Sequence, residues 1–191
     1  NLMSDELHEW AQSLDTLLAQ VWKRLGRGVA DRRAPGRHPT LATISPEGMP
    51  QARTVVLRSA DPDAGVATIF TDRFADKVDD VRAHPHAALH IWDNLAHLQI
   101  RLLTHVAVKT GAELEPIWAN LSDHARRCYG FSPASGEAIA EGLSYSKTPD
   151  ISAFAVLELT IERMDILHLG YQHRRAEFSR HNDWAGQWTV P

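Results

Sequence analysis

The spacing of apolar residues changes near residue 40 and divides the chain into two parts. Between residues 4 and 26 apolar side chains recur at every third or fourth position, which predicts one amphipathic helix. Ser4 is suited to cap its start, and Gly26 suits its end. Residues 27 to 39 are rich in Arg, Gly and Pro and have no periodicity, so they are predicted to form a loop.

Beyond residue 40 the apolar period is two, which is typical of β-strands. Strands are predicted at 40–45, 51–59, 66–71, 86–92, 97–109, 153–161 and 163–168. Pro46-Glu47-Gly48 marks a hairpin between the first two. A short helix is predicted at 75–84, and residues 111–143 are predicted to be mostly helical with breaks at Pro133 and Gly136. Many short strands with a few helices favour one mainly antiparallel barrel over a βαβ array.

The length and composition fit a single domain over residues 1–191, in which 1–37 form the N-terminal helix and loop. The chain has 191 residues, 43% of them hydrophobic, which is enough for one full core. We find no internal repeat and no low-complexity segment in the sequence.

Charge and cysteine content exclude several partner classes. With 20 Lys+Arg against 24 Asp+Glu the formal charge is -4, which argues against binding nucleic acid or a membrane surface. The apolar runs are too short to span a bilayer. Asp5 and Glu6 stand where a secretory signal would be basic. Because the one cysteine, Cys128, cannot form an internal disulfide, we expect a cytoplasmic protein.

Three segments concentrate groups that suit an anionic, planar cofactor. They are Arg53-Thr54-Val55-Val56-Leu57-Arg58; Phe70-Thr71 followed by Arg73 and Lys77; and Leu98-Gln99-Ile100-Arg101. A phosphate dianion needs charge-assisted donors, and the start of a helix offers further N–H groups. Taken singly, each segment is more often a solvated strand edge.

In their order and spacing these segments resemble the pyridoxamine 5'-phosphate oxidase-like family. The hairpin Ile44–Pro50 runs into Arg53–Arg58, Phe70-Thr71-Asp72 precedes Lys77 and His84-Pro85, and His97–Arg101 follows. The tail residues His173-Arg174-Arg175, Phe178, Trp184 and Pro191 resemble the family's C-terminal pattern. The resemblance covers residues 38–191 and implies a split β-barrel with an N-terminal helix and flanking helices. It also implies a homodimer that holds FMN at its subunit interface.

The resemblance also implies roles for individual residues. Arg53 would contact the polar edge or phosphate region of the flavin, and Val55 and Val56 would line its ring. Arg58 and Lys77 would hold the phosphate, helped by the hydroxyl of Thr71, which follows Phe70. Gln99 would bond the ring edge, and Arg174 or Arg175 would reach in from the tail. Arg53 and Arg58 are five residues apart, however, so a regular strand would send them to opposite faces.

Two departures from the family pattern bear on affinity and substrate. Phe74, Ala75 and Asp76 precede Lys77, where the family has a Ser or Arg pair, so a carboxylate facing the phosphate would weaken FMN binding. Trp118 and Ser122 stand where pyridoxamine phosphate oxidases have a Tyr and a phosphate-binding Arg. Efficient vitamin B6 oxidation is therefore not expected.

The function expected from these residues is an FMN-dependent oxidoreductase that acts on a small molecule or electron acceptor. No side chain is assigned a catalytic role, because the flavin itself accepts the hydride. The alternatives are a non-enzymatic FMN-binding or sensor module, or the same barrel holding haem or a deazaflavin. His84, His86, His90 and His97 lack the spacing and the Asp, Glu or Cys partners of a metal site, so no metal is expected.

Overall fold

The computed structural model describes residues 8–191, and within them the first helix begins later than its apolar pattern predicts. Helix α1 spans Leu14–Ala30, and the Ser13 hydroxyl caps it by accepting the N–H of Thr16. Residues 9–11 form a separate 3-10 turn, so the prediction of helix was wrong there and at the C-terminal end. The predicted cap Ser4 lies outside the described residues.

Neither of the two glycines in α1 ends the helix, and Gly28 is required by packing. Gly26 was predicted to end it, but the helix continues to Ala30. A Cβ on Gly28 would lie 2.4 Å from the carbonyl carbon of Gly36 in the following loop. This close approach requires glycine inside the helix, and it holds the loop 31–39 against α1.

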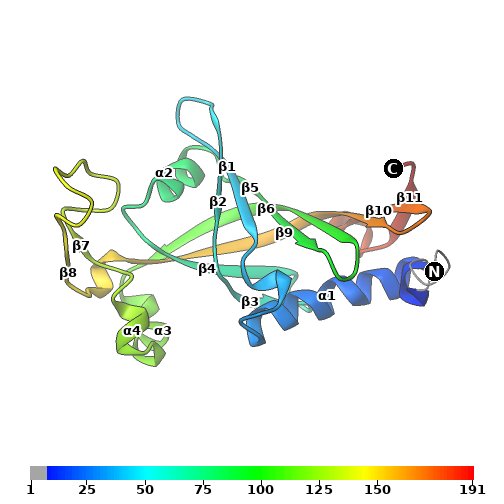
Figure 1. Ribbon diagram of the computed structural model, residues 1–191, viewed down its shortest axis with the longest axis horizontal. Helices are drawn as coiled ribbons and strands as arrows, with labels where there is room; N and C mark the ends of the chain where they lie inside the picture. The colour runs from blue at the N-terminus through cyan, green and yellow to red at the C-terminus, as the bar shows by residue number, and fades with distance from the viewer. Residues whose placement is uncertain (1–7) are drawn as a thin grey trace.

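The sheet is antiparallel and has nine strands. They are β1 (Thr40–Ile44), β2 (Pro50–Thr54), β3 (Leu57–Asp61), β4 (Val66–Asp72), β5 (His86–Asp93), β6 (Leu98–Thr110), β9 (Phe154–Leu169), β10 (His173–Ser179) and β11 (Gly186–Thr189). Their order is β11-β10-β9-β6-β5-β1-β2, and the β3–β4 hairpin joins through the pairing of β4 with β9. Because β9 pairs with β4, β6 and β10, the sheet curls into the predicted split barrel (Figure 1).

The barrel core is closed by the apolar stripe of α1. Leu17, Val21 and Leu25 are completely buried and pack with strand residues such as Leu57 and Leu89 in one cluster. Figure 1 shows α1 running beneath the strands. The stripe therefore covers the chain's own barrel. No helix among residues 8–191 has the length and apolar content to cross a bilayer.

Strand β9 replaces the two strands that the sequence predicts at 153–161 and 163–168. The pairing with β6 joins Thr104 to Ile161 and Leu103 to Arg163, so Glu162 is an extra residue, a β-bulge. The interrupted alternation thus reflects a bulge in one long strand. Beyond residue 170, β10 and β11 extend the sheet where the sequence had predicted no strand.

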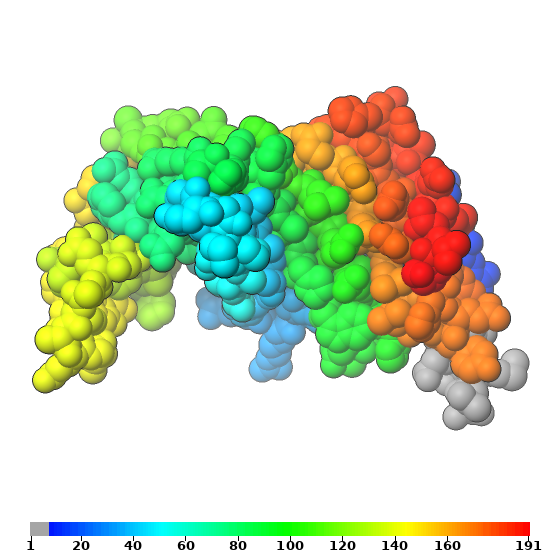
Figure 2. All heavy atoms as spheres, turned by 90° about the horizontal axis from the view of Figure 1, so that it is seen from above, coloured from blue at the N-terminus to red at the C-terminus, as the bar shows by residue number. Residues whose placement is uncertain are grey.

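The prediction that residues 111–143 are mostly helical was wrong. Helices α3 (Glu115–Asn120) and α4 (Asp123–Arg126) are short, and β7 (Phe131–Ser132) pairs with β8 (Ser146–Lys147). Residues 133–145 between β7 and β8 are irregular and stand out from the body (Figure 2). Gly130 redirects the chain with φ at +112°, and a Cβ there would lie 2.1 Å from the carbonyl oxygen of Thr148. Helix α2 (Asp76–Ala83) lies where the sequence predicts it.

Candidate functional site

A cavity of about 330 Å³ lies where β3, β4 and α2 meet the segment 128–135, and we call it the cationic pocket. Its walls bring together segments that lie far apart in the sequence. Six of the predicted cofactor-binding residues line it, namely Val55, Val56, Arg58, Phe70, Thr71 and Lys77. Other lining residues include Asp72, Ala75, Cys128, Tyr129, Phe131 and Ser135.

A break in the second predicted strand separates Arg53 from Arg58. Strand β2 ends at Thr54 and β3 begins at Leu57, so Val55 and Val56 lie between two strands. Arg58 lines the cationic pocket, whereas Arg53 does not. The guanidinium of Arg53 forms an ion pair of 3.0 Å with the buried Asp80 and also donates to the hydroxyl of Thr43. The two arginines therefore have different environments, as their odd spacing suggested.

Arg58 brings an unsatisfied donor to the cavity. Its Nε is buried and has no hydrogen-bond partner among the described residues, which is costly unless a ligand supplies an acceptor. Its guanidinium lies 5.5 Å from the ring centroid of Phe70, within cation–π range. Burial raises the pKa of the neighbouring Tyr129 phenol, and the positive charge of Arg58 partly offsets that rise. Tyr129 is thus a neutral hydroxyl beside a cation.

Lys77 supplies the second cation of the cavity. Its Nζ donates to the hydroxyl of Thr71 at 3.2 Å. Burial lowers the pKa of Lys77, and the charge of Arg53 lowers it further, while the carboxylates of Asp76, Asp72 and Asp80 act in the opposite direction. A bound anion would favour the charged ammonium. Arg58, Lys77 and Thr71 together are the donor set that a phosphate group requires.

The two acidic residues nearest the pocket have different roles. The buried Asp72 carboxylate accepts the backbone N–H of Phe74 at 2.9 Å and of Gly130 at 3.0 Å. It therefore ties the end of β4 to the segment that forms the opposite wall. Asp76 is exposed and does not line the pocket. Its Oδ1 would lie 3.1 Å from a Cβ on Gly136, so its carboxylate faces the 133–145 segment.

The remaining predicted residues, Gln99, Arg174 and Arg175, lie at the other end of β9. Thr71 pairs with Ala155, whereas Gln99 pairs with Leu167, twelve positions farther along β9. At the rise of an extended chain this is roughly 40 Å. Within one chain these three residues do not share a site with the cationic pocket.

At that far end Asp165 pairs with two of the arginines. Its carboxylate lies 2.5 Å from Nη2 of Arg101 and 2.8 Å from Nη2 of Arg175. Hydrogen bonding to Arg175 is the main cause that lowers the pKa of Asp165. Gln99 contacts the ring of His90 at 3.1 Å. Within residues 8–191, the one hydrogen bond that Arg174 donates is to the backbone carbonyl of Gln172, at 3.4 Å.

Sequence reasoning missed the wall formed by Cys128, Tyr129, Phe131 and Ser135. These residues lie in a segment without periodicity, where Gly130 and the predicted breaks at Pro133 and Gly136 were the local signs of turns. Trp118 lies in α3, but Ser122 lies outside that helix and caps α4 by accepting the N–H of Ala125. No group of three or more His, Cys, Asp or Glu in residues 8–191 is arranged to hold a metal ion.

Comparison with known proteins identifies the family. The family model described as pyridoxamine 5'-phosphate oxidase matches residues 11–168. The pyridoxine/pyridoxamine 5'-phosphate oxidase of Microcystis aeruginosa is 40% identical over 99 residues, which are 51% of this chain and 44% of that protein. The enzyme of the same name from Mycolicibacterium paratuberculosis is 38% identical over 80 residues, 41% of this chain and 35% of that protein. The matches thus span less than half of these relatives.

Two solved structures share the fold along nearly the whole chain. A pyridoxamine 5'-phosphate oxidase-related, FMN binding protein from Nostoc punctiforme superposes with a TM-score of 0.74 and 24% identity, covering 91% of this chain and 96% of that one. PhzG from Burkholderia lata was solved with tetrahydrophenazine-1-carboxylic acid. It superposes with a TM-score of 0.72 and 18% identity, and the match covers 97% of this chain and 97% of that one. This chain belongs to the pyridoxamine 5'-phosphate oxidase-like FMN-binding family.

Proposed function

We propose that this protein is an FMN-dependent oxidoreductase whose cationic pocket holds the flavin phosphate. The observation that carries the proposal is the buried, unpaired Nε of Arg58 in a cavity that also presents Lys77 and Thr71. A phosphate dianion would satisfy the open donor and offset the mutual repulsion of the cations. A neutral ligand could accept from the open donor, but it would leave the repulsion between the cations in place.

The same cavity has a wall suited to the rest of the flavin. Val55 and Val56 lie in the break between β2 and β3, so their backbone is not part of either strand. Apolar side chains and the ring of Phe70 continue this wall. When bound, FMN accepts a hydride at N5. The role of the chain's residues is to bind and orient the cofactor, and none is needed as an acid or base.

A homodimer would complete the site, because the two groups of predicted residues are too far apart within one chain to contact one flavin. In the two-fold dimer that we propose, each cationic pocket would lie against the far end of the second copy. We assign Gln99 of the partner subunit and Arg174 of the partner subunit to the flavin. Arg175 is less suited, since it already pairs with Asp165. The outer face of the sheet offers an apolar groove of about 540 Å³ for pairing, lined by Ala42, Ile44, Pro50, Ala88 and Leu103 among others.

The experiment combines flavin titration with a measurement of mass in solution. FMN should bind with quenched fluorescence, and light scattering should give about twice the chain mass of 21.3 kDa. Gln99→Ala and Arg174→Ala should weaken FMN, whereas Arg82→Ala, an exposed arginine on α2, should not. A monomer that binds FMN with full affinity would refute the shared site. An oxidoreductase, unlike a sensor module, must also reoxidise its reduced flavin faster when its acceptor is added.

Pyridoxamine 5'-phosphate is a poor candidate for the substrate. The position of the family's phosphate-binding Arg is Ser122, whose hydroxyl is used to cap α4. One Arg–phosphate contact contributes about 1.5–3 kcal/mol. We therefore expect kcat/KM for pyridoxamine 5'-phosphate to lie well below that of an authentic oxidase assayed in parallel, and comparable values would contradict this assignment.

A further inference from the structure

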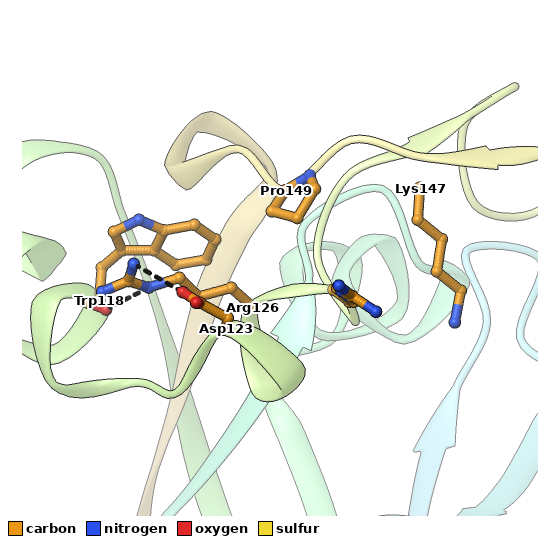
Figure 3. Close-up of a pocket in the computed structure, with 6 residues that line it drawn as sticks. Trp118, Asp123, Arg126, Lys147 and Pro149 are labelled. Atoms are coloured by element: carbon orange, nitrogen blue, oxygen red, sulfur yellow. Dashed lines mark hydrogen bonds and ion pairs between the residues drawn. The ribbon is translucent and has the colours of Figure 1, made fainter.

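Two cavities besides the cationic pocket are lined by several cations. One, of about 640 Å³, lies beside α3 and α4 (Figure 3). Its Arg126 is already bonded within the chain, to the carbonyl of Trp118 and the carboxylate of Asp123. The ring centroid of Trp118 lies 6.2 Å from that of Tyr129, which lines the cationic pocket. This cavity therefore belongs to the region of the proposed flavin site.

The other cavity, of about 340 Å³, lies between α1 and the end of β5, and we call it the α1 cavity. Residues of α1 between Gln20 and Arg27 form one wall, and residues of the loop between Asp31 and Gly36 form another. Ile91, Asp93 and Leu95 complete it. The lining thus joins three segments that are separate in the sequence.

The α1 cavity is distinct from both parts of the proposed flavin site. It shares no lining residue with the cationic pocket. Ile91 and Asp93 are buried toward α1, and alternation along β5 places His90 on the opposite face. The side chain of His90 contacts Gln99 there. The cavity and Gln99 therefore lie on opposite faces of the sheet.

The loop wall of the α1 cavity is held firmly against α1. The backbone of Gly36 packs so closely on Gly28 that no side chain fits between them. Nη1 of Arg37 donates to the carbonyl of Val29 at 2.8 Å. The cavity is therefore formed before any ligand enters, which lowers the entropic cost of binding.

Arg24 is held in place by Asp93. Oδ2 of Asp93 lies 2.5 Å from Nη1 of Arg24, and Oδ1 accepts the backbone N–H groups of Leu95 and Ala96, each at 3.1 Å. The guanidinium also lies 5.2 Å from the ring centroid of Trp10. Nε of Arg24 is buried and has no hydrogen-bond partner among residues 8–191. Arg24 therefore retains an unused donor, which is costly in a folded protein.

Two of the cations that line the α1 cavity have no carboxylate partner. Besides Arg24, these cations are Lys23, Arg27 and Arg33. Arg27 lies 3.5 Å from the carboxylate of Asp31. Lys23 and Arg33 are exposed, and no carboxylate within residues 8–191 lies at ion-pair distance from either. The cavity therefore carries two uncompensated positive charges.

We propose that the α1 cavity binds a small organic anion with a doubly charged head group, such as a phosphate monoester. Lys23 and Arg33 bind the head group, because a dianion is best held by more than one charge-assisted donor. Pro35 and Leu95 are apolar lining residues and contact the rest of the ligand. Leu95 is 81% exposed, so covering it removes apolar surface from water.

The test is calorimetric titration of the full chain with phenyl phosphate at about pH 8, where a phosphate monoester is a dianion. The protein carries one equivalent of FMN, which fills the cationic pocket. Phenol, which has the ring without the charge, should bind at least about tenfold more weakly than phenyl phosphate. Inorganic phosphate, which has the charge without the ring, should also bind more weakly, because it loses the apolar contact.

Variants assign the binding to the α1 cavity. Lys23→Gln and Arg33→Gln should each weaken phenyl phosphate by about tenfold. Arg32→Gln is the matched control, because it removes the same charge one position away from a residue that does not line the cavity. It should leave the affinity unchanged. Lys77→Ala without FMN should bind phenyl phosphate in the α1 cavity as tightly as wild type, and Arg33→Gln should bind FMN normally.

The outcomes for the α1 cavity and for the flavin can be separated. No binding of phenyl phosphate, equal binding of phenol, or normal binding by a Lys23→Gln, Arg33→Gln double variant would each overturn the cavity proposal. An equal loss in Arg32→Gln would overturn it as well, since the effect would then come from net charge. Loss of phenyl phosphate binding in Lys77→Ala would place the probe in the cationic pocket. Failure of FMN to bind wild type would refute the proposed function only.

Discussion

The two ends of β9 each gather arginines, but they differ in how the positive charge is compensated. At the Phe154 end, Arg58 and Lys77 face a cavity, and a buried guanidinium nitrogen has no partner in the described chain. At the Leu169 end, the buried carboxylate of Asp165 lies between Arg101 and Arg175. The sequence alone does not distinguish these arginines, because Arg58, Arg101 and Arg175 each lie within a β-strand.

The difference shows which charges the chain uses for its own stability. A buried charge that is paired within the chain needs no ligand, whereas a buried donor without a partner is costly until a ligand supplies an acceptor. At the Phe154 end, Arg58 and Lys77 have no carboxylate partner among residues 8–191, whereas at the Leu169 end the Asp165 carboxylate links β6, β9 and β10. Gln99 and Arg174 are the exceptions there, because no carboxylate within residues 8–191 pairs with them.

The largest expected effect is a loss of FMN affinity when a cation is removed at the Phe154 end of β9. Lys77→Ala and Arg58→Ala should each weaken FMN by about ten- to a hundred-fold, the equivalent of one charge-assisted hydrogen bond. Riboflavin, which lacks the phosphate, should bind both variants almost as it binds wild type. Fluorescence titration of both flavins measures this, with Arg82→Ala on the same helix as the control. Equal weakening of both flavins by Lys77→Ala would show that Lys77 does not contact the phosphate.

The second prediction concerns the Leu169 end of β9, where His168 should make the stability of the fold depend on pH. The His168 side chain is fully buried on β9, and its Nε2 lies 3.0 Å from Nδ1 of His8. Burial is the main cause that lowers the pKa of His168 to about 4, and the charge of His8 is the second cause. The pKa of His168 is lower in the folded protein than in the unfolded chain. Its contribution to stability is therefore fully present above the unfolded pKa and is lost as the pH drops toward 4. Between pH 7 and pH 5 the free energy of unfolding should fall by about 2 kcal/mol from this group. Urea unfolding of wild type and His168→Gln at both pH values isolates the contribution, and an equal decrease in both proteins would contradict it.

Asp165→Asn should destabilise the fold and leave the phosphate site intact. The substitution removes charge-assisted bonds to two partly exposed arginines, for which we expect about 1–2 kcal/mol. Arg175 lowers the pKa of Asp165, so the contribution is present above the unfolded pKa and is lost as pH falls through the lower folded value. The difference from wild type in urea unfolding should therefore narrow below about pH 4. Glu177→Gln, which alters a longer contact of 3.8 Å to Arg175, is the milder control.

Asp76→Ser should have the smallest effect on FMN affinity. It tests whether a carboxylate compensates the positive charge at the Phe154 end of β9. The exposed Asp76 carboxylate faces the 133–145 segment and stays outside the cationic pocket. FMN affinity should therefore rise by no more than about twofold, as expected for a screened surface charge. Tightening of tenfold or more, measured by the same titration, would place the carboxylate against the phosphate.

Much of the fold and about half of the lining of the cationic pocket follow from local sequence patterns. Period-two alternation predicts β1, β4, β5 and β6 closely, because side chains of a half-buried strand must alternate between core and solvent. Arg58, Phe70, Thr71 and Lys77 could be selected because their motifs lie within short segments. The odd spacing of Arg53 and Arg58 predicted that a regular strand would place them on opposite faces, and the strand is in fact broken at Val55 and Val56.

Other features depend on contacts that only the folded chain makes. The alternating pattern is interrupted at residue 162 because a β-bulge lies there, and β6 pairs with β9 on both sides of it. Strands β10 and β11 form because β10 pairs with β9 and β11 pairs with β10. Tyr129 and Phe131 complete the cationic pocket because the Asp72 carboxylate binds the N–H of Gly130, 58 residues away along the chain. Whether an arginine is neutralised likewise depends on a distant carboxylate. Sequence therefore determined which residues could bind an anion, and tertiary structure decided which remain available, because charge compensation acts through space.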